Sequence, residues 1–152
     1  MIKRTGRSIA VLLPLALAAV VPAKAQEPVP DLVGVWQATE GGMLLWHGGT
    51  VRNGEGSHLT IEIDKQDGPY FSGTMTYTNP TEVGGHDGAD LVHTGVEKFI
   101  GVIGWDGETI TLVDTPDVGY WHTTLVDANT IAVVGVEAGE FAVAGRYMLK
   151  RQ

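Results

Sequence analysis

The stretch Leu59–Thr78, LTIEIDKQDGPYFSGTMTYT, decides the fold. In its first part aliphatic residues alternate with polar ones, which is the period of a strand with one buried face. The segment Gln66–Pro69, QDGP, is typical of a turn, and the alternation then resumes from Phe71 to Tyr77. The stretch therefore predicts a β-hairpin with one apolar face.

The same pattern continues along the chain. Short runs of Val, Ile, Thr and aromatic residues are broken about every 8 to 12 residues by Gly, Asp, Asn or Pro. Asp106-Gly107 between two apolar runs is a strong hairpin signal, and no window has a helical period longer than two turns. Strands are predicted over residues 32–39, 57–65, 70–78, 96–104, 109–114, 119–126, 131–137 and 141–150.

Consecutive hairpins without helices leave two unpaired edges. About eight strands is the number at which closure gives a small barrel that can hold one ligand. We therefore predict an all-β fold, a single antiparallel up-and-down β-barrel over residues 31–152. A β-sandwich is the alternative, because strand spacing alone does not separate the two folds.

The first 25 residues have the pattern of a secretory signal. Basic residues precede the apolar run Ile9–Val21, and Ala23-Lys24-Ala25 follows it. That run is shorter than the roughly 20 residues needed to span a bilayer, so no membrane span is expected. We expect cleavage near Ala25, a flexible lead-in over residues 26–30, and a periplasmic or secreted protein.

Charge and composition exclude several classes of partner. The whole chain has a net charge of -8; without Lys3, Arg4, Arg7 and Lys24, six basic residues face 18 acidic ones, giving -12. Such an acidic protein lacks the basic face that nucleic acids require. There is no cysteine, so packing rather than disulfides must stabilise the domain. We find no motif that calls for a cofactor, and none is expected.

Gly34-Val35-Trp36, on the first predicted strand, resembles the G-x-W signature of the calycins, the group of lipocalins, avidin-type proteins and related barrels. In that group a basic side chain of the last strand packs over this tryptophan and closes the barrel. The resemblance gives that role to Arg146, where cation–π attraction would hold it. Later lipocalin motifs and a C-terminal helix are not evident, so the length is more similar to avidin-type barrels.

The role that the barrel and the resemblance imply is binding of a small, largely apolar ligand inside the barrel. The glycine-rich segment 41–56 surrounds Met43–His47, and it is either a lid over the barrel mouth or else a short extra strand or a plug that fills the barrel with its own side chains. Both interpretations stay open. The predicted wall residues are Trp46, Tyr77, Tyr120, His122 and Phe141.

A cyclase- or isomerase-type enzyme acting on an apolar substrate is the second hypothesis. Period 2 places Tyr120 and His122 on one face of their strand and Trp121 on the other. If Asp114 meets His122 across a hairpin, the carboxylate could orient the imidazole, and Glu97 could complete a proton relay. The simpler interpretation is a surface His122 and a core Trp121. With no cysteine and no G-x-S-x-G motif, a hydrolase is not expected, and binding is favoured over catalysis.

One loop carries side chains of the types that bind zinc. Its spacing fits no metal-site motif, so we interpret it as a solvated loop and assign no metal. These weak candidates are His86, Asp87, Asp90 and His93.

The run from Val96 to Trp105 is apolar on both faces, and only one face can point into a barrel. The other face is then an exposed patch, which usually marks a contact. A homo-oligomer, or a protein-interaction or inhibitor module, is the third hypothesis, with Phe99, Ile103 and Trp105 as the contact side.

Overall fold

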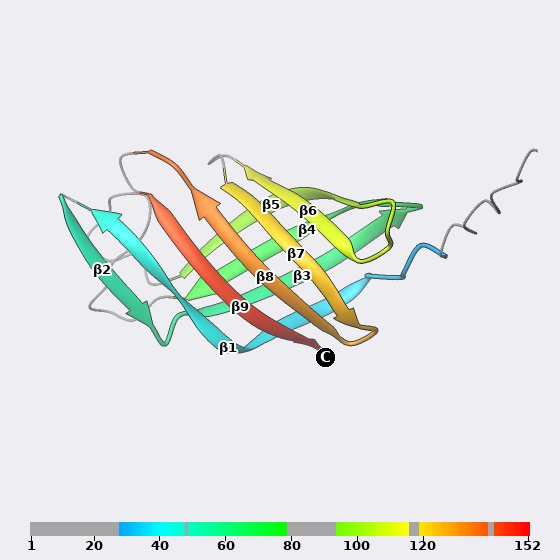
Figure 1. The fold of residues 1–152 in the computed structure, drawn as a ribbon, viewed down its shortest axis with the longest axis horizontal. Coiled ribbons are helices and arrows are strands. Elements are labelled where there is room, and N and C mark those ends of the chain that lie inside the picture. Colours follow the sequence, from blue (N-terminus) through cyan, green and yellow to red (C-terminus); the bar gives the residue numbers. More distant parts are fainter. Residues whose placement is uncertain (1–27, 48, 79–93, 116–118, 140–141) are drawn as a thin grey trace, which may run out of the picture.

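The computed structural model describes residues 28–47, 49–78, 94–115, 119–139 and 142–152. Over these ranges the elements are all strands, as predicted (Figure 1). They are β1 (Gly34–His47), β2 (Thr50–Glu55), β3 (His58–Asp67), β4 (Tyr70–Thr78), β5 (Thr94–Ile103), β6 (Thr109–Thr115), β7 (Gly119–Asp127), β8 (Thr130–Glu137) and β9 (Val143–Arg151).

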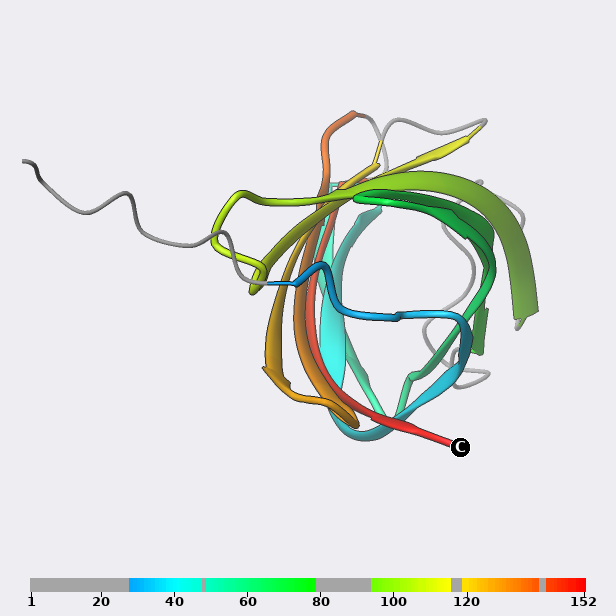
Figure 2. The ribbon, with the colours of Figure 1, turned by 90° about the vertical axis from the view of Figure 1, so that its right-hand side faces the viewer.

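The strands close into an antiparallel barrel. From β3 to β9 each strand pairs with the next one along the chain, and β1 closes the ring by pairing with both β3 and β9. This ring has eight strands. The ninth strand, β2, pairs with the C-terminal part of β1 on the edge that β9 does not use. Figure 2 shows the ring of strands nearly end-on. The predicted up-and-down barrel is confirmed, and the sandwich alternative is wrong.

β2 and β3 continue each other along β1. The β2 pairs end at Gly42↔Glu55 and the β3 pairs begin at Gln37↔Thr60. Both chains advance by the same number of residues between these two pairs, so β2 and β3 share one register along β1. The break between β2 and β3 contains Gly56, whose positive φ of 86° suits a residue without a side chain. The glycine-rich segment is therefore a hairpin extension of the barrel wall, the extra strand rather than the lid.

Large inner side chains fill the barrel because glycines stand opposite them. The ring of Phe71 lies over Gly101 on the paired strand, and the ring of Trp121 lies over Gly135. A Cβ atom at Gly101 would lie 2.2 Å from the Phe71 ring, and one at Gly135 would lie 2.3 Å from the Trp121 ring. This pairing of large side chains with glycines leaves little empty space in the small interior.

One end of the barrel is sealed by residues 28–33. They cross the end of the ring ahead of β1, as the blue segment of Figure 2 shows. Trp36 is fully buried beneath them, and its Nε1 donates to the carbonyl of Leu32 at 2.9 Å. Gln66 fixes the segment from the side, because it accepts from the Leu32 N–H at 2.8 Å and donates to the Pro30 carbonyl at 2.8 Å.

Arg151, and not Arg146, lies over the tryptophan. Its guanidinium carbon is 4.4 Å from the centre of the Trp36 ring, and Nη1 donates to the carbonyl of Val33 at 2.9 Å. The prediction for Arg146 is wrong because successive residues of a strand face opposite sides of the sheet. Arg146 and Arg151 are an odd number of positions apart on β9, so they lie on opposite faces. Arg151 pairs directly with Trp36, whereas Arg146 is exposed on the outer wall opposite Gly42.

The predicted contact side of β5 is also corrected. Phe99 and Ile103 point into the core and are 2% and 4% exposed. The outer face of the strand carries Val96 and Ile100, both about two-thirds exposed, and Trp105 lies exposed in the following turn. Any contact through β5 would therefore use the opposite face to the one that the sequence predicted.

Candidate ligand site opposite the sealed end

Opposite the sealed end, inward-facing side chains form a cup. Every strand of the ring except β6 contributes to its lining. The lining residues are Met43, Leu59, Tyr77, Glu97, Trp121, Glu137, Val143 and Tyr147. The cup encloses about 30 Å³, enough for about one or two water molecules.

Below the cup the barrel is filled. The space between Trp36, Phe71 and Leu112 is only about 10 Å³, near the lower limit for a single water molecule. Sites for drug-sized ligands occupy roughly 300–1,000 Å³. The predicted cavity inside the barrel is therefore not present among the described residues, and the cup is the other small space on their inner face.

Asp114 holds the tryptophan wall of the cup. This carboxylate is 5% exposed, and its Oδ2 accepts from the indole Nε1 of Trp121 at 2.7 Å. Its Oδ1 accepts from the backbone N–H of Gly119 at 2.6 Å. With Gly135 beneath the ring and Asp114 at its edge, the indole orientation is fixed, and β6 supports the cup without lining it.

The predicted relay between Asp114 and His122 does not form. His122 is exposed on the outer wall, opposite Thr111 and Val134, while Asp114 points inward. The simpler interpretation of that strand is the one that the structure shows: an exposed His122 and an inward-facing Trp121. Because Asp114 is occupied by two N–H donors, it is part of the framework rather than half of an acid–base pair.

Two other predicted wall residues also lie outside the barrel. Tyr120 is 49% exposed and shares the outer face of β7 with His122. Trp46 is 47% exposed, since Met43 and Leu45 take the inward positions at the end of β1. For these residues, and for His122, the prediction of an inner wall is wrong.

Tyr77 and Glu97 are the predicted site residues that line the cup. The sequence argument missed Trp121, Glu137 and Tyr147 as lining residues, although strand alternation contained the signal. Glu137 lies an even number of positions from the buried Val133 on β8, and Tyr147 lies an even number of positions from the buried Leu149 on β9. Each of them therefore faces the same side of its strand as that buried residue. The other predicted residues lie outside the described ranges: Phe141, His86, Asp87, Asp90 and His93.

Tyr147 lines the cup, and its hydroxyl is buried. The residue is 4% exposed, and within the described structure its oxygen has no hydrogen-bond partner. The nearby Ser57 hydroxyl donates instead to the Gly54 carbonyl at 2.6 Å. Burial raises the pKa of Tyr147 to about 12, against a smaller opposing effect of Ser57. The phenol is therefore neutral over the physiological range.

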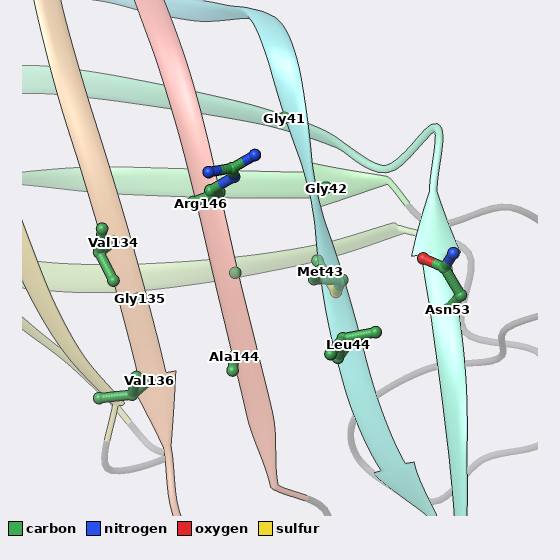
Figure 3. Close-up of a pocket in the computed structure, with 11 residues that line it drawn as sticks. Gly41, Gly42, Met43, Leu44, Asn53, Val134, Gly135, Val136, Ala144 and Arg146 are labelled. Atoms are coloured by element: carbon green, nitrogen blue, oxygen red, sulfur yellow. The ribbon is translucent and has the colours of Figure 1, made fainter.

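A shallow groove of about 570 Å³ lies on the outer wall, over β8, β9 and β1 (Figure 3). The small residues Ala144 and Gly42 form the floor of the groove, and the larger side chains of Val134 and Leu44 form its two sides. Arg146 lies at the groove and is exposed. Compared with the cup, this groove lacks aromatic lining and a converging set of polar groups, which are the marks of a small-molecule site.

Two kinds of feature are absent from the described ranges. These ranges contain no group of three or more His, Asp or Glu side chains that could hold a metal ion. They also contain no helix long and apolar enough to cross a membrane.

Comparisons with known proteins give a likeness of architecture. No protein-family model and no curated protein match the chain. A redesigned β-barrel is similar at 14% identity, covering 80% of this chain and 91% of that chain, with a TM-score of 0.46. The S-type phycobiliprotein lyase of Guillardia theta is 8% identical, over 80% and 88%, with a TM-score of 0.47. A de novo designed fluorescence-activating β-barrel is 11% identical, over 86% and 99%, with a TM-score of 0.41.

Proposed function

We propose that this protein is an exported, calycin-like barrel that binds a small, largely apolar ligand at the end opposite residues 28–33. The observation that carries this proposal is the contrast between the two ends. One end is sealed by residues 28–33 over Trp36 and Arg151, and the other presents the aromatic and aliphatic cup. Apolar lining with a few converging polar groups is the usual composition of a ligand site.

The ligand would lie across the rim of the barrel rather than along its axis. Because the interior is filled, only a small group can enter the cup. Tyr77 on β4 and Trp121 on β7 offer aromatic surface from two separate strands, with Leu59 and Val143 as aliphatic neighbours. Contact with these side chains would remove apolar ligand surface from water, which is the main source of binding free energy.

The test is binding of a neutral, apolar fluorescent probe, N-phenyl-1-naphthylamine. We expect Trp121→Ala and Tyr77→Ala, on two different strands, each to weaken binding at least about tenfold, since each removes a large contact surface. Trp46→Ala is the matched control, because it removes an equally large ring from the outer wall. Loss of binding in Trp46→Ala with retention in both cup variants would place the site outside the cup and overturn the proposal.

Export has a separate test. Expression with the full leader should yield a periplasmic or secreted protein whose first residue is Gln26, as read by N-terminal sequencing. A full-length chain retained in the cytoplasm would contradict export without affecting the ligand site.

The outer wall favours self-association as a second candidate function. Leu44, Trp46, Val134 and Val136 are each between 45% and 50% exposed, on two sides of the groove floor formed by Gly42 and Ala144. In a two-fold dimer of identical chains the same surface meets itself, so it must be self-complementary. Protruding side chains beside a groove on one face satisfy that requirement, because the side chains of each copy can enter the groove of the other. Light scattering after size exclusion should then show a dimer that Trp46→Lys converts to a monomer; a wild-type monomer would remove this candidate.

A further inference from the structure

We infer that two copies of this chain pair about a two-fold axis over Leu44, with the Trp46 ring of each copy seated on Gly42 of the other. This inference rests on the self-association proposed above and specifies its geometry. The spacing of these three residues on β1, the shape of the wall around them and its charge each point to a second copy as the partner.

Gly42, Leu44 and Trp46 lie on the outer face of β1. Met43 and Leu45, which alternate with them, point inward and are 9% and 4% exposed. Leu44 lies midway between the other two. A two-fold axis that lies between two facing walls, over Leu44 and at a right angle to β1, therefore brings Trp46 of one copy over Gly42 of the other. The largest side chain of the three then meets the position that has no side chain.

That axis runs along a row of outward-facing residues that pair directly across five strands. The row consists of Tyr120, Val136, Ala144, Leu44 and Asn53. Because Ala144 and Gly42 are small and form the groove floor (Figure 3), the two walls can approach closely beside Leu44. The Trp46 ring of the other copy would supply the aromatic surface that the groove itself lacks.

The charge of this face suits a second copy. Outside the leader, 18 acidic residues exceed six basic ones, so two copies repel each other at long range. Among the described residues that line the groove there is no Asp or Glu, and the charged one is Arg146. Arg146 pairs with Gly42, so it lies beside the place where the Trp46 ring of the other copy would sit, and cation–π attraction would act there.

The size of the face predicts a weak dimer. The strands β7, β8, β9, β1 and β2 lie about 4.8 Å apart, which makes the face roughly 24 Å wide. Three outward positions on each strand cover roughly 20 Å along it. Two copies would then bury on the order of 1,000 Å² in total, at the low end for specific interfaces. We expect a reversible dimer with a dissociation constant on the order of 10 μM.

Single-cysteine variants report the geometry directly, because the chain has no cysteine. A residue on a two-fold axis meets its own copy. Leu44→Cys should therefore give a covalent dimer with bismaleimidoethane at concentrations near the dissociation constant. Val96→Cys is the control, since Val96 is 67% exposed on the outer face of β5, and it should stay monomeric. Crosslinking of Val96→Cys without Leu44→Cys would move the contact to β5 and overturn the inference.

Gly42→Val tests the contact from the other side. Gly42 is not among the glycines with positive φ, so a β-branched residue suits its strand backbone. The added side chain would occupy the place of the Trp46 ring, and the dissociation constant from equilibrium ultracentrifugation should rise at least about tenfold. Thr74→Val, on the outer face of β4, is the control and should leave it unchanged. Urea unfolding of dilute protein checks that both variants fold.

Salt separates an apolar contact from one held by ion pairs. Raising sodium chloride should tighten the dimer, because salt screens the repulsion between two acidic copies. A dimer that salt weakens would be held by charged contacts and would overturn the inference.

The outcomes separate this geometry from self-association itself. A wild-type dimer without a Leu44→Cys crosslink, and with full affinity in Gly42→Val, would overturn the geometry and leave self-association in place. A wild-type chain that is still monomeric at about 100 μM would remove both. Neither result affects ligand binding at the cup.

Discussion

Asp114 and Trp121 are joined by a 2.7 Å hydrogen bond between a buried carboxylate and an indole N–H, at the end of the barrel opposite residues 28–33. The second carboxylate oxygen accepts from the backbone of Gly119, so both oxygens of Asp114 have donors. The Tyr120-Trp121-His122 run therefore divides by face. The tryptophan is held inside as a wall of the cup, and its two neighbours point to solvent.

Replacing Asp114 by Asn should destabilise the barrel by about 2–3 kcal/mol, because the new amide places a donor against one of two N–H donors in a buried site. Urea unfolding measures the loss, and the Trp121 indole resonance should shift. His122→Ala on the outer face is the control and should stay within about 0.5 kcal/mol. Equal stability of Asp114→Asn and wild type would contradict the supporting role of this carboxylate.

Arg151→Ala should lower the free energy of unfolding by about 2–3 kcal/mol, since it removes a cation over the Trp36 ring and the donors to the segment that seals the barrel. Trp36 should also become accessible to acrylamide quenching. Arg146→Ala should change stability by less than about 0.5 kcal/mol, because Arg146 is exposed. The opposite ranking of these two variants would return the closing role to Arg146.

Thr123→Val should leave stability unchanged or raise it by about 1 kcal/mol. Thr123 is 3% exposed, and its hydroxyl has no partner within the described structure, so an isosteric methyl group removes an uncompensated desolvation cost. Calorimetric melting measures the change, with Thr124→Val at the exposed neighbouring position as the control. A clear loss of stability would mean that the hydroxyl has a partner.

Gly135→Ala should destabilise the barrel by about 1–3 kcal/mol, because the added Cβ would lie 2.3 Å from the Trp121 ring. The same substitution in a Trp121→Ala background should be much less harmful, since the ring that it strikes is gone. A double-mutant cycle by urea unfolding measures this coupling. Additive effects would show that the ring and the glycine do not share that space.

Stability should fall between pH 10 and about 12 as Tyr147 ionises. The pKa of Tyr147 is raised from 10.0 to about 12, so its contribution is fully present below pH 10 and is lost as the pH rises through the folded-state value. The loss is on the order of 2 kcal/mol. Urea unfolding across this range should decline more steeply for wild type than for Tyr147→Phe, and parallel curves would contradict the burial of the phenol as the cause.

Local alternation was sufficient to predict the strands and hairpins, and the count of about eight strands favoured their closure into a barrel. The hairpin from Leu59 to Thr78 and the Asp106-Gly107 turn are short-range patterns, and the structure has strands on both sides of each. The same alternation would also have placed Glu137 and Tyr147 on the inner face, given one buried neighbour in each strand.

The closing pair needed information that no local pattern contains. Whether Arg146 or Arg151 faces Trp36 depends on the register of β9 against β1, which shifts between Ala38 and Glu40. Which face of β7 turns inward was equally undetermined, because both faces carry large side chains. In the structure Gly135 makes room for Trp121, a partner that comes from the next strand.

Residues 28–33 and the final residues Arg151 and Gln152 come together at the same end of the barrel, where the Gln152 N–H donates to the Val35 carbonyl at 2.9 Å. A peptide joined before residue 28 or after Gln152 would therefore emerge on the side away from the cup. A molecule tethered to a bead or a sensor chip through either terminus would present its cup toward the solution. Surface-based binding measurements can thus use either attachment, and agreement between the two would check that the tether does not obstruct the probe.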